Sequence, residues 1–293
     1  MQPLFKDGKT KCFTLSYDDG VIQDLRLIDI FDRYGLKCTF NLNSGLFGHK
    51  ASRNDFPNPV RNDRIEAELI RKTYRNHEIA VHTLTHPKLQ YLSREAIDYE
   101  VLEDRKKLEE ITGSPVTGMA YPYGTYDETV VEELRKCGIR YARTTEPTWA
   151  FSVPKDFLRW HPTVHFGNER MERLVKQFLD PDFLGRDNTL LPVFYVWGHS
   201  YELDGNDTWG LMEEFCRKVS GLKDTWYATN GEIERYVSAV RGLIFSADEK
   251  VVTNPSAEAV WLLVDGEAVR VDGGTTKKLE KKAPSQVFTL EGF

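Results

Sequence analysis

The sequence predicts an α/β fold in which a parallel sheet is covered by helices, with a small antiparallel β appendage at the C-terminal end. Up to about residue 240, runs of β-forming residues alternate with helical patterns, which is typical of parallel strands joined by helices. Beyond Arg241, short strand patterns follow one another, and Asp265-Gly266 between two of them signals a hairpin. We therefore predict a main domain and an appendage, over residues 1–240 and 241–293.

Length and composition fit this division and exclude one class of function. The chain has 293 residues, of which 40% are hydrophobic and 29% are charged, as is ordinary for a globular protein. Its formal net charge is -6 and it has no long basic run, so nucleic acid is not expected as the main partner. These numbers leave the oligomeric state open.

The compartment is predicted from the N-terminal residues and the cysteines. Residues 1–8 contain no apolar segment of the kind that a signal peptide needs, and no apolar run reaches the roughly 18 residues that span a bilayer. The cysteines are far apart in the sequence, without a C-x-x-C pair, which fits reduced thiols. We therefore expect a cytoplasmic protein without a membrane span.

The main domain opens with a strand, a helix and a second strand. The strand predicted over residues 11–17 runs into Asp18-Asp19-Gly20, which has the composition of a turn. Apolar residues then recur at helical spacing over residues 25–34, and the glycine that follows can cap the helix. A second strand is predicted over residues 38–43, which completes the start of a parallel sheet.

The rest of the chain continues the alternation. Further strands are predicted over residues 78–81, 116–120, 141–143, 191–196 and 226–229, and helices over residues 63–74, 93–112, 128–137, 169–179, 208–219 and 230–240. Residues 149–168 have no clear periodicity and are predicted to be irregular. In the appendage, strands are predicted over residues 243–246, 251–253, 260–264 and 268–271.

Four chemically reactive positions share one topological place. Asp18, His82, Tyr123 and His199 each come just after the C-terminal end of a predicted strand. In α/β barrels these strand ends converge on one face of the barrel, where active sites lie. We therefore expect the four residues to meet in one site.

His82 and His86 are predicted metal ligands. They are four residues apart, and Pro87 follows them. Two neutral imidazoles suit zinc and similar transition ions, and a third protein ligand would leave one position open for water. The alternative is a pair of structural histidines held by hydrogen bonds, but the carboxylates at another strand end favour the metal.

Asp18 and Asp19 are adjacent and therefore point in different directions, so the two carboxylates can do different work. A plain turn is the alternative interpretation of Asp-Asp-Gly. We assign Asp19 to the metal and Asp18 to the general base, since a carboxylate beside an activated water can accept its proton.

Three motifs together resemble the polysaccharide deacetylases, the NodB-homology proteins of carbohydrate esterase family four. These motifs are Ser16-Tyr17-Asp18-Asp19-Gly20, His82-Thr83-Leu84-Thr85-His86-Pro87 and Tyr121-Pro122-Tyr123-Gly124, and they follow the family's order within residues 10–240. The resemblance implies a distorted (β/α) barrel of the NodB-homology type and metal-dependent removal of acetyl groups from sugars. It implies the same roles at the matching positions, with Asp18 as base and Asp19, His82 and His86 as ligands of one divalent ion. Zinc is the expected ion, with cobalt, nickel and iron as alternatives.

The resemblance also implies roles in the third motif. The backbone N–H of Tyr123 would stabilise the oxyanion, and Tyr121 and Pro122 would line the substrate site. Many family members carry an arginine two residues before the proline that restrains the base, but this chain has Ala120 there. Arg143 and Arg159 are the two candidates that could replace it.

The last predicted strand of the site leads to His199, which by resemblance is the general acid for the leaving amine or alcohol. Val196 and Trp197 would line the pocket for the acetyl methyl group.

A short match to the family's fourth element, Asp156 with Trp160, lies in the irregular region and can be accidental. Two histidines of the same region, His161 and His165, are interpreted as surface or packing residues.

The sequence therefore predicts a metal-dependent hydrolase that removes acetyl groups from N- or O-acetylated carbohydrate. One alternative is a hydrolase with the same metal centre that cleaves a non-sugar amide, including a cyclic one. Another is a barrel that binds carbohydrate without catalysis. The sequence does not distinguish between N- and O-acetyl groups and does not identify the sugar.

Overall fold

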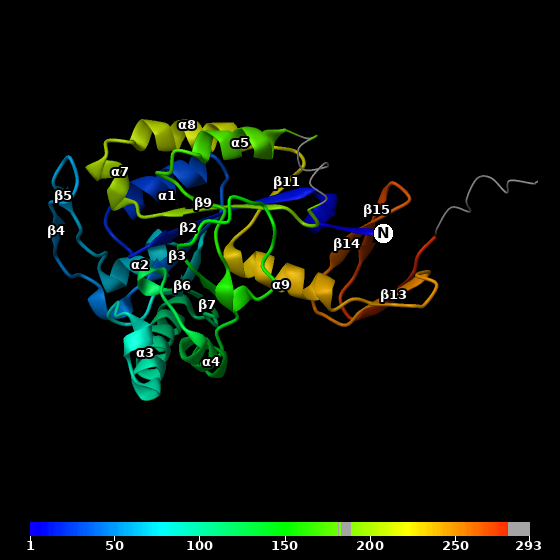
Figure 1. Ribbon diagram of the computed structural model, residues 1–293, viewed down its shortest axis with the longest axis horizontal. Helices are drawn as coiled ribbons and strands as arrows, with labels where there is room; N and C mark the ends of the chain where they lie inside the picture. Colours follow the sequence, from blue (N-terminus) through cyan, green and yellow to red (C-terminus); the bar gives the residue numbers. More distant parts are fainter. Residues whose placement is uncertain (181, 183–188, 281–293) are drawn as a thin grey trace, which may run out of the picture.

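The computed structural model describes residues 1–180, 182 and 189–280. Its main feature is an eight-stranded parallel sheet with the order β8-β7-β6-β3-β2-β10-β9, in which β11 also pairs with β2. The strands are β2 (Lys11–Asp18), β3 (Cys38–Leu42), β6 (Glu78–Val81), β7 (Gly118–Ala120), β8 (Tyr141–Arg143), β9 (Val164–His165), β10 (Val193–Gly198) and β11 (Thr225–Tyr227). The predicted α/β barrel of the NodB-homology type is confirmed, as a curled parallel sheet with helices (Figure 1).

Helices cover the sheet on more than one side. They are α1 (Asp24–Arg33), α2 (Ala67–Thr73), α3 (Arg94–Thr112), α4 (Glu128–Lys136), α5 (Met171–Leu179), α7 (Tyr201–Gly205), α8 (Trp209–Val219) and α9 (Asn230–Arg241). Short 3-10 turns occur at Lys6–Gly8, Ser44–Leu46, Leu89–Tyr91, Pro122–Gly124 and Phe157–Arg159. In Figure 1, α1, α5 and α8 lie together above the sheet and α3 and α4 lie below it, and the buried side chains of all five helices belong to one core cluster on the outer face of the curl. Within the described residues, every helix is too short or too polar to cross a bilayer.

Strand β2 shows how the sheet separates an apolar layer from a polar interior. All of its residues are buried, and successive side chains point to opposite faces of a sheet. Phe13 and Tyr17 belong to the core cluster under the helices. The alternate residues face the inside of the curl, where Thr14 Oγ1 is 2.9 Å from Asn230 Oδ1 and Ser16 Oγ accepts from Asn41 Nδ2 at 2.8 Å. Asp18 stands at the end of this inner row.

The sheet closes through a segment that the sequence predicted to be irregular. Trp160 N–H donates to Ala142 O at 3.0 Å, and Thr144 N–H donates to Trp160 O at 3.1 Å, so this segment pairs with β8. Four residues later, β9 pairs in parallel with β10. The segment thus links the two sides of the curled sheet, and the buried ring of Trp160 fills the space between them.

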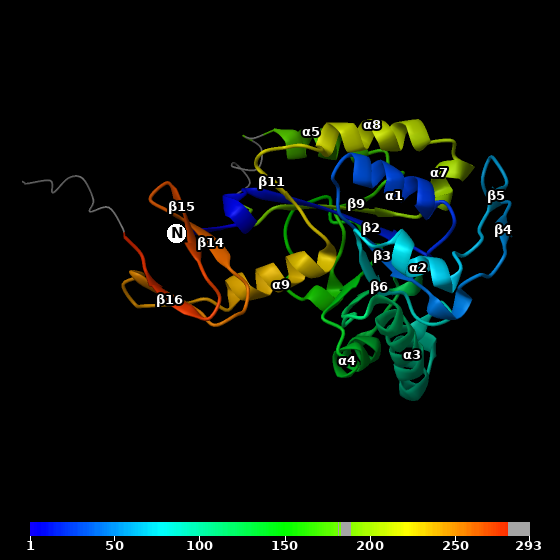
Figure 2. The ribbon, with the colours of Figure 1, turned by 180° about the vertical axis from the view of Figure 1, so that it is seen from behind.

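The C-terminal strands form two small antiparallel sheets. One contains β12 (Ile244–Phe245), β13 (Val251–Asn254) and β16 (Thr275–Lys278), and the other contains β14 (Val260–Val264), β15 (Glu267–Val271) and β1 (Gln2–Leu4). The predicted hairpin at Asp265-Gly266 is confirmed, since β14 and β15 pair around it and both turn residues have positive φ. These strands lie at one end of the molecule in both views (Figures 1 and 2).

The pairing of β1 with β14 brings the start of the chain into the C-terminal sheet, which the sequence did not predict. The predicted domain boundary at residue 240 stays a prediction. Residues 281–293 of the predicted appendage lie outside the described part of the chain.

Local helix signals were accurate where a side chain caps the helix. Ser93 accepts from Ala96 N at the start of α3, and Gly113 ends that helix with φ 72°. At the start of the helix predicted over residues 230–240, Thr229 caps α9 and forms a capping box with Glu232. The pattern also missed the hairpin of β4 (Ser52–Arg53) and β5 (Val60–Arg61), whose strands are too short to show periodicity.

The closure segment gives a stability prediction. Trp160→Ala should destabilise the protein by about 3–5 kcal/mol, because it leaves a cavity between β8 and β10. Urea unfolding followed by fluorescence and circular dichroism measures this difference. Leu211→Ala is the control, since that side chain is 60% exposed and should change stability by about 0.5 kcal/mol or less. A loss below about 1 kcal/mol for Trp160→Ala would contradict its role in closing the sheet.

Candidate metal and catalytic site

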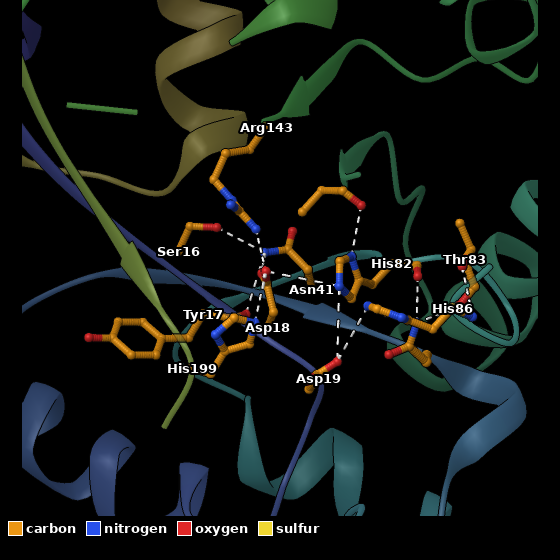
Figure 3. A network of polar contacts seen from close by, with 12 residues as sticks. Ser16, Tyr17, Asp18, Asp19, Asn41, His82, Thr83, His86, Arg143 and His199 are labelled. Carbon is orange, nitrogen blue, oxygen red and sulfur yellow. Dashed lines mark hydrogen bonds and ion pairs between the residues drawn. The ribbon is translucent and has the colours of Figure 1, made fainter. Parts of the chain in front are cut away.

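The strand ends bring the predicted aspartates and histidines together (Figure 3). His82 Nε2 lies 3.9 Å from Asp18 Oδ2 and 4.0 Å from Asp19 Oδ1. His86 Nε2 lies 3.9 Å from Asp19 Oδ1, and His199 Nε2 lies 3.9 Å from Asp18 Oδ2. Residues from β2, β6 and β10 therefore surround one small space, as their strand-end positions led us to expect.

Asp19, His82 and His86 fit a metal ion. Their ligand atoms lie within 4.8 Å of one another. Among the described residues, none donates a hydrogen bond to the buried Oδ1 of Asp19, although Arg64 forms an ion pair with it, and this oxygen faces both histidines. His82 Nδ1 is 2.8 Å from Ala120 O, and because a carbonyl only accepts, Nδ1 carries the proton and Nε2 is free to bind metal.

The turn after β6 is shaped to return His86 toward His82. Thr83 and His86 both have positive φ, 66° and 65°, which is unfavourable for residues with a Cβ and must be held in place. Asn43 Nδ2 donates to His82 O and Thr83 O at 2.5 and 3.0 Å, and Asp104 Oδ2 accepts from His82 N–H at 3.1 Å. As a result, the ring centroids of His82 and His86 are only 4.8 Å apart.

Arg143 restrains Asp18. Its guanidinium is fully buried and donates to Asp18 Oδ2, while Asn41 Nδ2 donates to Asp18 Oδ1 at 2.8 Å. Burial raises the pKa of Asp18, but the charges of Arg143, His82 and His199 outweigh it and hold that pKa below its ordinary value. Asp18 is therefore ionised, as a base must be.

Arg143 of the neighbouring strand takes the place of the arginine that the resemblance led us to expect at position 120. Ala120 of β7 and Arg143 of β8 are direct partners in the sheet register, so the arginine stands in the same row, one strand further on. The other candidate, Arg159, instead binds Glu128 at 2.6 Å and Asp156.

Asp19 has its own arginine, which the sequence did not predict. Arg64 Nη1 donates to the backbone carbonyl of Asp19 and lies 2.9 Å from Oδ1. Burial raises the pKa of Asp19, and the charges of Arg64 and the neighbouring histidines lower it far more, so the carboxylate is ionised. Arg64 lies within the helix predicted over residues 63–74, but α2 begins only at Ala67, so Arg64 stands in the segment before the helix and only the three-dimensional arrangement brings it to the site.

Glu202 holds His199. Its Oε1 is 3.0 Å from His199 Nδ1, and its Oε2 accepts from the His199 N–H at 3.2 Å. Burial lowers the pKa of His199, but the hydrogen bond and charge of Glu202 raise it above its ordinary value overall, helped by Asp19 and Asp18. The sequence contains a signal for Glu202, since it follows His199 by three residues.

His165, which was interpreted as a surface or packing residue, is partly exposed and also reaches Glu202. Its Nε2 lies 2.9 Å from Glu202 Oε2. His165, His199 and Glu202 are close enough to hold a metal ion as well, but Gly167 N–H donates to His165 Nδ1 at 3.2 Å. The proton of His165 therefore sits on Nε2 and points at Glu202, which indicates a hydrogen-bonded group and not a ligand set.

The residues predicted to contact substrate differ in their exposure and in their distance from the site. Tyr123 is 56% exposed, and its ring centroid is 4.6 Å from that of His86. Trp197 lies at the site with the Arg143 guanidinium 4.3 Å from its ring centroid. Tyr121 and Pro122 are buried, and Tyr121 donates to Leu158 O at 2.7 Å.

Val196 belongs to the core under the helices, on the face of β10 opposite to Trp197. Contact of substrate with Tyr121, Pro122, Val196 and Trp197 stays a prediction.

The short match at Asp156 and Trp160 has structural roles. Asp156 Oδ1 accepts from Leu158 N–H at 2.9 Å and caps the 3-10 turn, while Trp160 closes the sheet. His161 lies outside the group of site residues, with Nδ1 2.7 Å from Thr144 Oγ1.

Comparisons with known proteins point to one family. The family model described as polysaccharide deacetylase matches residues 5–142. The protein YxkH of Bacillus subtilis (strain 168), whose name places it among the polysaccharide deacetylases, is 24% identical over 143 residues. That alignment covers 48% of this chain and 47% of YxkH, so the chain matches about half the length of this relative.

Two solved structures are similar to this one. A structure from Mycobacterium smegmatis that is assigned to the polysaccharide deacetylases has 17% identity and a TM-score of 0.57, with 82% of this chain and 95% of that chain covered. The Streptococcus pyogenes deacetylase PplD in complex with acetate has 18% identity and a TM-score of 0.48, covering 57% of this chain and 69% of that one. The first similarity supports the fold.

The geometry of the two aspartates predicts that their variants bind metal differently. Asp19→Asn should weaken Zn²⁺ binding by more than the roughly 10–100-fold that loss of an outer-shell partner costs, because it removes a ligand charge. Asp18→Asn should stay within about tenfold of the unmodified protein, since Asp18 is held by Arg143 and Asn41. Competition with a chromophoric chelator measures both affinities. Equal losses in the two variants would contradict the division of roles.

Proposed function

Residues 5–142 of this chain belong to the polysaccharide deacetylase family, and from this we propose that the protein is a metal-dependent hydrolase that removes acetyl groups from N- or O-acetylated carbohydrate. The observation that carries the proposal is the pair of aspartates, of which one faces two histidines and the other is held as an anion beside them. If Asp18-Asp19-Gly20 were only a structural turn, neither the two histidines nor the buried arginine would be needed beside the aspartates.

Asp19, His82 and His86 are the residues that would hold the ion. A divalent transition ion, zinc by preference, would supply Lewis acidity that polarises the acetyl carbonyl and makes water easier to deprotonate. The position of Asp19 Oδ1 opposite the Nε2 atoms of both histidines and the fixed tautomer of His82 support this assignment. Cobalt, nickel and iron are compatible with the same ligands.

Asp18 acts as the general base. It is ionised, and Arg143 and Asn41 fix both carboxylate oxygens in place, so it accepts the proton of the attacking water as the new C–O bond forms. Because these partners are buried with it, the carboxylate does not need to be reorganised during the reaction.

Tyr123 and His199 complete the reaction. The backbone N–H of Tyr123, on a turn with φ 59° at that residue, donates to the developing oxyanion. Because the Glu202 carboxylate only accepts, Nδ1 of His199 keeps one proton, and the imidazolium form, which the raised pKa of His199 favours, carries a second proton on Nε2 toward Asp18 and the reacting centre. It gives this proton to the leaving nitrogen or oxygen as the bond to the acetyl carbon breaks, which yields acetate and the free amine or alcohol.

A substrate panel tests the proposed function. Metal-loaded protein is incubated with N-acetylated glucosamine oligosaccharides, O-acetylated xylo-oligosaccharides and small cyclic amides, and the released acetate or opened ring is quantified. We expect acetate from at least one of the two carbohydrates, none after chelation, and recovery when zinc is returned. Ring opening of the cyclic amides without any acetate from the carbohydrates would contradict the proposal.

The buried ion pair predicts that Arg143 is required while Arg159 is not. Arg143→Gln should lower kcat by about 100-fold or more, because a base that is no longer fixed loses most of its contribution. Arg159→Gln is the matched control, as Arg159 binds only exposed or half-exposed carboxylates. Circular dichroism checks the fold of both variants, and a larger loss in Arg159→Gln would reverse the assignment.

Glu202 predicts a change in the pH dependence. Its charge raises the pKa of His199, so His199 keeps its proton to higher pH and the alkaline limb of kcat reports its deprotonation. Glu202→Gln removes this charge, the pKa of His199 falls, and the alkaline limb should move to lower pH. Glu214→Gln, at an exposed ion pair on α8, should leave the limb in place. A limb that does not move in Glu202→Gln would contradict His199 as the acid.

A further inference from the structure

The segment between β3 and α2 returns over the metal site. It leaves the sheet after β3, forms the β4–β5 hairpin and then pairs with the turn that follows Asp19. Ile22 N–H donates to Asp63 O at 2.9 Å, Ile65 N–H donates to Gly20 O at 2.9 Å, and Val21 bridges to Arg64. Arg64 is thereby fixed beside Asp19 from both sides.

The Arg64 side chain is only 10% exposed, and its charge lies against the metal-facing carboxylate. Nη1 is 2.9 Å from Asp19 Oδ1, which is the same oxygen that faces His82 Nε2 and His86 Nε2. Its hydrogen bond goes to the backbone carbonyl of Asp19, a residue with φ 85°. The guanidinium therefore steadies an unfavourable backbone conformation, and its charge acts on Oδ1 through an ion pair and not through a hydrogen bond.

The charges explain why this arrangement is unusual for a metal site. Arg143 neutralises Asp18, the base, but Arg64 neutralises Asp19, which is the carboxylate that has to hold a cation. An arginine keeps its charge at any ordinary pH. In a buried site, where water screens poorly, a fixed positive charge beside a ligand opposes the binding of a second positive charge.

We propose that Arg64 is a positioning residue that keeps Asp19 in place without the ion and weakens the hold of the site on the ion. This rests on the proposed function, in that Asp19, His82 and His86 bind the metal. Because the guanidinium withdraws negative charge from Oδ1, the ion keeps more of its own charge for polarising a carbonyl. The site therefore exchanges its ion more readily than two histidines and a free carboxylate would.

A purely structural role for Arg64 predicts the opposite change in metal affinity. If Arg64 served only to fix the shape of the Asp19 turn, its loss would misplace the ligand and weaken metal binding. If its charge dominates, its loss strengthens metal binding. The sign of the change in affinity therefore separates the two roles, and it requires no measurement of catalysis.

The test is the Zn²⁺ dissociation constant of metal-free protein, measured by competition with a chromophoric chelator, for Arg64→Gln and Arg64→Lys. We expect Arg64→Gln to bind zinc about tenfold more tightly or better, and Arg64→Lys, which keeps the charge, to stay within about threefold of the unmodified protein. Arg61→Gln is the control, because Arg61 is 70% exposed and pairs with Asp63 on the same segment. Unchanged or weaker binding in Arg64→Gln overturns the proposal.

Thermal unfolding gives a second readout. Without metal, Arg64→Gln should unfold at a lower temperature than the unmodified protein, since Asp19 is left buried without its counter-ion. Saturating zinc should raise its unfolding temperature by more than it raises that of the unmodified protein. If Arg64→Gln does not fold, a tenfold or greater loss of affinity in Arg64→Lys overturns the proposal, and retained affinity supports it. Failure of the unmodified protein to bind zinc would contradict the proposed metal centre instead.

Discussion

Two adjacent aspartates are buried side by side at the end of β2, and the rest of the site compensates their charges. Asp18 is 2% exposed and Asp19 is 7% exposed. Burying two carboxylates so close together is strongly unfavourable unless each has its own cationic partner. Arg143 and Arg64 supply those partners, and the imidazoles of His82, His86 and His199 surround them. The arginines and histidines that contact the two aspartates therefore offset the cost of burying them and also take part in the proposed reaction.

The curl of the sheet makes this compensation possible. In the sheet order, β8 is separated from β2 by β7, β6 and β3, so Arg143 reaches Asp18 only because the sheet bends until its inner faces meet. The 160–165 segment closes the gap between β8 and β10 and keeps the two sides at that distance. The site and the closure of the barrel therefore depend on the same bend.

The sequence predicted the parts of this structure that are encoded locally. Strand runs, helix caps and the hairpin at Asp265-Gly266 were visible because each depends on neighbouring residues. Asp18, Asp19, His82 and His86 were visible because they follow strand ends in recognisable motifs, and the structure brings them together. Residues that act across long distances in the chain were harder to find.

Arg143 illustrates this limit, because its partnership with Asp18 depends on the register between β7 and β8, which no periodicity reveals. Arg64 was included in the helix predicted over residues 63–74, whereas α2 begins at Ala67, and β9 and β1 are strands too short to show alternation. Glu202 differs from these, since its spacing from His199 was a local signal. A search for carboxylates three or four residues from each candidate histidine would have found it.

The most direct measurement of the central claim is a crystal structure of the protein with zinc, with anomalous scattering recorded at the zinc absorption edge. The division of roles between the two aspartates predicts an ion bound by Asp19 Oδ1, His82 Nε2 and His86 Nε2, while Asp18 remains paired with Arg143. An ion bound by Asp18, or one held only by His165, His199 and Glu202, would contradict it.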